Sequence, residues 1–192
     1  GYFGQYSLTE EGKAIYKTPQ ILITKEKIST TSDLEPIMIA LSKAGKNELV
    51  IYCEDIDMSV ASRLAITHLQ GGFKTLIIKA PTLWKDWLFE DLAKMTGATP
   101  VSNKEGKTFK NLTTEDLGTC EKIISTKEET RVIGIKDISE HLNVLKEKAL
   151  TDDQQKLRMS WLQTKVATLK VGANSESELS YLLKKRESFC LE

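Results

Sequence analysis

Residues 49–79 read LVIYCEDIDMSVASRLAITHLQGGFKTLIIK, and this stretch decides the expected fold. Its two ends, residues 49–53 and 75–79, are short apolar runs, which is typical of buried strands. Between them, residues 56–70 carry apolar side chains at helical spacing, and Gly71 and Gly72 end the pattern. A strand, a helix and a second strand in this order predict a parallel pair joined by a right-handed crossover.

The preceding residues extend the same alternation. The run QILIT at 20–24 predicts another buried strand, and residues 33–44 predict a helix that leads into the strand at 49–53. Three strands with two intervening helices indicate a largely parallel sheet. We therefore expect an α/β fold with a mostly parallel sheet core flanked by helices.

The second half of the chain predicts further helices and an antiparallel strand pair. The compact pattern gives way to a charged helix near residue 171, so we divide the chain into a domain at 1–171 and a C-terminal helical extension that begins at 172–192. The remaining expected elements are helices at 84–96, 137–149, 152–165 and 175–189, an antiparallel pair at 123–125 and 131–135, and a strand at 166–171.

The helix at 56–70 carries more apolar residues than one buried face needs. One stripe contains Val60 and Leu64, and a second, offset around the axis, contains Ala61, Ala65 and Ile66, with Met58 and Leu69 at its edges. The second stripe has two interpretations. Either the helix is buried on both sides, or it borders an exposed apolar groove that binds other chains.

Composition argues against several classes of partner. The chain of 192 residues has 27 basic and 27 acidic side chains and only four arginines, which favours neither a nucleic-acid-binding protein nor a protein that binds an anionic membrane surface. No apolar run approaches the ~20 residues of a membrane span, and no signal peptide is visible. Cys53, Cys120 and Cys190 match no metal-binding pattern and indicate thiols in an intracellular reducing compartment.

The usual catalytic motifs are missing: the sequence contains no P-loop, no dinucleotide fingerprint and no nucleophile elbow. Glu54 and Asp55 follow a strand directly, a position where α/β enzymes often keep a carboxylate. The simpler interpretation is that they cap the next helix. His68 is interpreted as a surface or capping residue, and His141 as an ordinary residue of an amphipathic helix.

Several short strings, in their order and spacing, carry a resemblance to one family. They are AGK at 44–46, ED at 54–55, KAP at 79–81, TGATPVS at 96–102, TEDLG at 114–118, TKEET at 126–130, KVGA at 170–173 and SESE at 175–178. The whole chain resembles the apical domain of a GroEL-type group I chaperonin, followed by the start of its return into the intermediate domain. The chain is therefore expected to be a piece of a larger protein.

The resemblance implies a binding domain with no catalytic residue, metal or cofactor of its own. In that family two helices and a nearby extended segment bind non-native polypeptides and the mobile loop of a GroES-type co-chaperonin. The parent protein is implied to be a ring of subunits that hydrolyses ATP with Mg, and Glu176 matches a residue used between subunits. The implied polypeptide-binding positions are Tyr2, Tyr6, Ser7, Glu35, Met38, Ala61, Ala65 and Ile66.

Some residues depart from the family pattern. Ser7 and Glu35 stand at positions that are usually large and apolar, which predicts a weaker or more selective client surface. Ser188 falls where the family has its catalytic aspartate, so either the alignment slips and Glu187 takes that role, or the parent hydrolyses ATP poorly.

Two other functions stay open. One is a chaperonin-like structural or interaction subunit with little folding activity, and the other is a small α/β enzyme that uses Glu54 and Asp55. A plastid, mitochondrial, phage or bacterial origin is equally compatible with the sequence.

Overall fold

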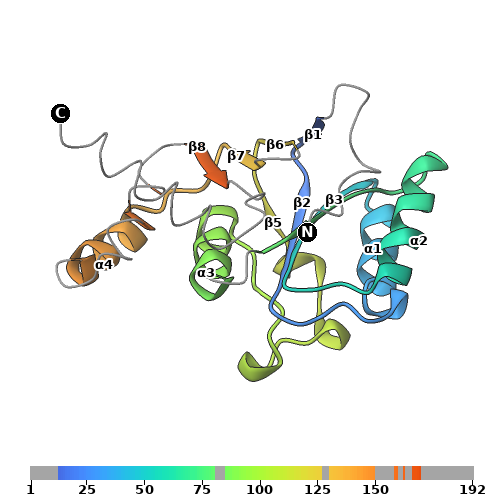
Figure 1. Cartoon of the computed structure of the whole chain (residues 1–192), viewed down its shortest axis with the longest axis horizontal. Helices are drawn as coiled ribbons and strands as arrows, with labels where there is room; N and C mark the ends of the chain where they lie inside the picture. Colours follow the sequence, from blue (N-terminus) through green and yellow to red (C-terminus); the bar gives the residue numbers. More distant parts are fainter. Residues whose placement is uncertain are drawn as a thin grey trace, which may run out of the picture.

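The computed structural model describes residues 13–80, 85–126, 130–149, 158–159, 162 and 166–169. Within them the chain is an α/β protein with two four-stranded sheets and the helices α1 to α4 (Figure 1). The strands are β1 (Ala14–Lys17), β2 (Gln20–Thr24), β3 (Glu48–Cys53), β4 (Lys74–Lys79), β5 (Gly118–Thr119), β6 (Lys122–Ser125), β7 (Thr130–Ile133) and β8 (Val166–Leu169). The helices are α1 (Glu35–Lys43), α2 (Met58–Leu69), α3 (Lys85–Thr96) and α4 (Ser139–Ala149).

The first sheet has the strand order β4-β3-β2-β5 and confirms the predicted strand–helix–strand alternation. The pairs β2–β3 and β3–β4 are parallel, and only the two-residue strand β5 is antiparallel to β2. Helix α1 connects β2 to β3, and α2 connects β3 to β4. Gly71 adopts a φ of 73° just after α2, as expected for a glycine that ends a helix.

Alternate side chains of this sheet enter two different cores, because successive residues of a strand point to opposite faces. Leu22, Ile51 and Ile77 pack with buried residues of α1 and α2. Ile23 and Tyr52 point to the other face, where they pack with apolar residues of α3, β1, β6 and β7. The apolar runs are continuous because both faces of these strands are buried.

The second sheet has the order β1-β6-β7-β8 and is entirely antiparallel. The hairpin of β6 and β7 confirms the predicted antiparallel pair. The sequence did not predict β1, nor that this second sheet packs against the face of the first sheet opposite α1 and α2. In Figure 1, α1 and α2 lie side by side at one end of the molecule, while α4 lies at the other end beyond α3.

Several expectations fall outside the described residues. Only residues 158, 159 and 162 of the helix expected at 152–165 are described, and all three are helical. The helix expected at 175–189 lies outside them, as does the domain boundary after residue 171.

Candidate functional site

A groove of about 350 Å³ lies between α1 and α2. Its apolar lining consists of Leu34, Met38, Ile39 and Leu64, and its polar lining of Thr31, Glu35, Ser42, Arg63 and Thr67. The α1 contributors recur at intervals of three and four residues, which places them on one face of the helix. Leu34 and Leu64 also belong to the buried core below, so the floor of the groove is anchored on the sheet.

Apolar side chains are exposed on the two helices that form this groove, and one of them, Ile39, lines it. Six large apolar side chains are exposed among the described residues, and four of them, Ile39, Met58, Ile66 and Leu69, lie on α1 and α2. The exposed fractions reach 64% for Met58 and 68% for Leu69. Clustered exposed apolar residues mark binding surfaces more often than isolated ones do.

The structure separates the predicted binding residues into three groups. Glu35 and Met38 line the groove. Ala65 and Ile66 lie on α2 outside the groove lining, and Ile66 is 54% exposed. Ala61 is only 7% exposed and belongs to the core cluster, so its expected place on an exposed stripe is wrong. The residues of the predicted second stripe therefore do not share one exposed face: Ala61 faces the core and Ile66 faces solvent.

Some predicted binding residues cannot be placed. Tyr2, Tyr6 and Ser7, together with Glu176, lie outside the described residues.

Sequence reasoning predicted only Glu35 and Met38 of the groove lining, and the residues that it missed include Ile39 and Arg63. Ile39 follows Glu35 by one helical turn, so its position could have been found from Glu35 and the helical period. Arg63 is exposed and stands four residues before Thr67, whose hydroxyl donates a hydrogen bond to the Arg63 carbonyl at 3.0 Å. Because Arg63 is polar, the apolar stripes of the helix did not predict its place in the groove.

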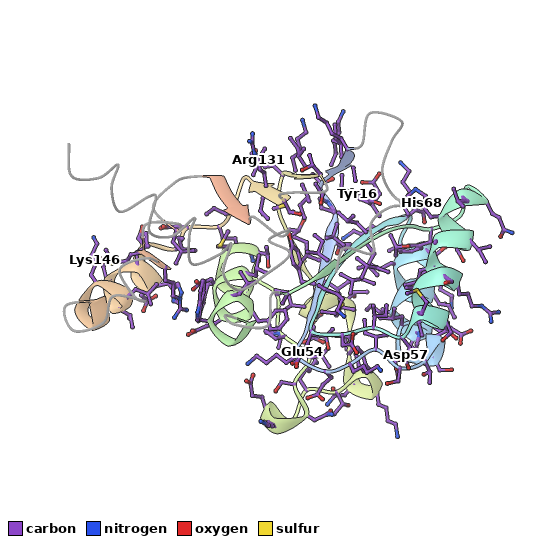
Figure 2. The ribbon with its side chains drawn as sticks, viewed as in Figure 1. Tyr16, Glu54, Asp57, His68, Arg131 and Lys146 are labelled. Atoms are coloured by element: carbon purple, nitrogen blue, oxygen red, sulfur yellow. The ribbon has the colours of Figure 1, made fainter. Side chains whose placement is uncertain are left out.

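The carboxylate of Asp55 is held by lysines and does not cap α2. Lys79 Nζ lies 2.6 Å and Lys27 Nζ 3.5 Å from its oxygens, and the hydrogen bond from Lys79 is the main reason that the pKa of Asp55 is lowered. The N-cap of α2 is Asp57, whose side chain makes no capping hydrogen bond and instead pairs with Lys27 at 2.6 Å. Figure 2 shows Asp57 and His68 at opposite ends of α2. The capping interpretation of Asp55 is thus wrong.

His141 is part of a buried charged cluster, so its interpretation as an ordinary helical residue is also wrong. Its Nε2 lies 2.7 Å from Oδ1 of Asp91 on α3, and Arg158 donates to both oxygens of the same carboxylate at 2.6–2.9 Å. Arg158 also donates to Glu90 at 2.6 Å and lies over the Trp87 ring. Burial alone would lower the pKa of Arg158, but these carboxylates outweigh it and raise the pKa. The cluster joins α3, α4 and the helical residues near 158.

A larger hollow of about 800 Å³ lies beside α3. Charged residues line much of it, and two of them, Lys25 and Glu105, pair with each other at 2.5 Å. Its other walls include Trp87 and the segment 97–100. Among the described residues, none of the large exposed apolar side chains lines this hollow, whereas Ile39 lines the groove between α1 and α2, which we therefore take as the candidate site.

Two other kinds of feature are absent from the part of the chain that the structure describes. Within the described ranges no three His, Cys, Asp or Glu side chains are grouped so that they could hold a metal ion. Of the helices that the structure describes, none has the length and apolar character needed to cross a membrane. No protein-family model matches the chain.

Proposed function

We propose that this chain is the polypeptide-binding domain of a group I chaperonin and that the groove between α1 and α2 binds apolar segments of non-native polypeptides. The observation that carries the proposal is the groove itself, with its floor of Leu34, Met38 and Leu64 and the exposed Ile39 in its lining. Unfolded chains share exposed apolar side chains and little else, so their receptor needs an attraction without strict direction. An open apolar groove between two helices supplies it.

The same surface is proposed to bind the mobile loop of a GroES-type co-chaperonin. A co-chaperonin loop and a client segment then compete for one site, which provides a route for client release. ATP hydrolysis with Mg and assembly into a ring are proposed for the parent protein. The residues implied for those roles, Glu176 and Ser188, lie outside the described part of the chain.

Peptide binding tests the proposal. A fluorescent apolar peptide, and separately a co-chaperonin loop peptide, are titrated with the full chain and followed by anisotropy. Met38→Glu and Ile39→Glu each place a carboxylate in the groove, and each is expected to weaken binding at least tenfold. Ile66→Glu reports whether the outer face of α2 also contributes.

Val144→Glu is the matched control, because Val144 is 46% exposed on α4 and far from the groove along the fold (Figure 1). It should bind peptide as the wild type does. Absence of binding to a wild-type chain shown to be folded by circular dichroism would overturn the proposal. That outcome would favour a structural subunit that has lost its client surface.

A further inference from the structure

Two opposite charges in the groove walls have no partner in the part of the chain that the structure describes. Arg63 on α2 and Glu35 in the first turn of α1 both line the groove and are both exposed. Among the described residues no ion pair or side-chain hydrogen bond satisfies either of them, and they do not pair with each other. Other exposed charges nearby, such as Lys27 and Asp57, do form ion pairs.

Their surroundings make these charges relevant to a bound segment. Accessible apolar side chains lie beside them: Met38 and Ile39, about one helical turn after Glu35, line the same groove as Arg63 and are not fully buried. A segment seated on those apolar residues would cover the groove and remove water from both charges. A covered charge without a counter-charge is unfavourable, whereas a covered ion pair with good geometry can favour binding.

We propose that the groove selects apolar segments that carry one acidic and one basic side chain, an inference that rests on the proposed function. The acidic side chain pairs with Arg63 and the basic side chain with Glu35. The guanidinium offers a planar fork of donors that matches a carboxylate, which makes Arg63 the stronger of the two determinants. The groove then distinguishes apolar segments of equal hydrophobicity by their charges.

A set of labelled peptides with one common apolar core tests this selection. The core is flanked by glutamine only, by one glutamate, by one lysine, or by one of each, with each charge placed on either side. For the wild-type chain, each charge that forms an ion pair is expected to tighten binding roughly three- to fivefold relative to the glutamine peptide. The peptide with both charges should therefore bind most tightly. The advantage should shrink in high salt.

Two single substitutions assign each preference to one residue. Arg63→Gln should remove the preference for glutamate and leave that for lysine, while Glu35→Gln should do the reverse. Lys43→Gln is the matched control, because Lys43 is an exposed charge on α1 outside the groove lining. It should leave both preferences unchanged.

The outcomes separate this inference from the function on which it rests. If no peptide binds, the proposed function fails. If all peptides bind the wild-type chain alike, or if Lys43→Gln alters the preferences as much as Arg63→Gln does, the groove is a peptide site but the charge selection is wrong. A preference that follows each substitution as described supports it.

Discussion

Arg63 and Arg158 both lie in helical segments, yet their side chains differ in exposure and in hydrogen-bond partners. Arg63 is exposed in the groove between α1 and α2 and has no partner among the described residues. Arg158 is only 6% exposed and donates hydrogen bonds to Asp91 and Glu90. The charge of Arg158 is buried and paired, whereas that of Arg63 is exposed and unpaired among the described residues.

This difference indicates which of the two charges matters for stability. A buried charge is tolerable only while its partners are present, so the cluster around Arg158 fixes the position of α4 and the helical residues near 158 against α3. An exposed charge is hydrated and contributes little to stability. Substitutions in the two regions should therefore affect different properties of the protein.

The largest effect is expected from Arg158→Ala. It leaves the Asp91 carboxylate, which is 3% exposed, without its main counter-charge, and such a loss costs about 3–5 kcal/mol of the free energy of unfolding. Arg63→Ala also removes an arginine side chain, but an exposed one in the groove, and should change the free energy of unfolding by less than about 0.5 kcal/mol. Urea denaturation of both variants measures the contrast. Equal losses would mean that the two arginines do not differ as the structure indicates.

A double substitution sharpens this result. Arg158→Met combined with Asp91→Leu removes both buried charges and keeps similar volumes, so it should recover much of the stability that Arg158→Ala loses. No recovery would indicate that the cluster stabilises the fold through its hydrogen-bond geometry, including the contact with His141, rather than by neutralising a buried charge.

A smaller contrast is expected between the two faces of α2. Leu64 is 5% exposed and packs in the core, so Leu64→Ala should cost about 2–4 kcal/mol. Ile66 is 54% exposed, and Ile66→Ala should cost less than about 0.5 kcal/mol. The free energies of unfolding of the two variants check this. A large cost at Ile66 would show that its face is covered in the folded chain.

The first sheet could be predicted from the sequence because its strands are apolar on both faces and alternate with helices. The second sheet could not be predicted in full. β1 has only four residues and pairs with β6, more than a hundred residues later, as at Ala14↔Ser125. Nothing local in the sequence specifies such a distant partner.

The candidate site was predictable in part for related reasons. Periodicity placed Ala61 and Ile66 on one stripe, but residues five positions apart lie about 140° apart around a helix axis, so Ala61 packs in the core while Ile66 is exposed. The pairing of Asp91 with Arg158 spans 67 positions and carries no local signal. That Arg63 and Glu35 have no ion-pair partner among the described residues could be seen only in the structure.

The smallest expected effect is a pH dependence that originates on α2. His68 Nδ1 accepts a hydrogen bond from the Thr75 N–H at 3.3 Å, and partial burial, followed by the charge of Lys74, lowers the pKa of His68. The folded state thus favours neutral histidine, whereas the unfolded chain takes up a proton near pH 6.5. This contribution to stability is complete above that pH and is lost as the pH falls through the lower pKa of the folded state.

His68→Asn keeps a hydrogen-bond acceptor for Thr75 but cannot titrate. Between pH 7.5 and 5.5, where carboxylates stay ionised, the wild type should lose stability relative to this variant. The difference should be less than about 1 kcal/mol, because His68 is only partly buried and water screens it. If the two proteins lose stability in parallel over this range, His68 is not the source of the pH dependence and the prediction is wrong.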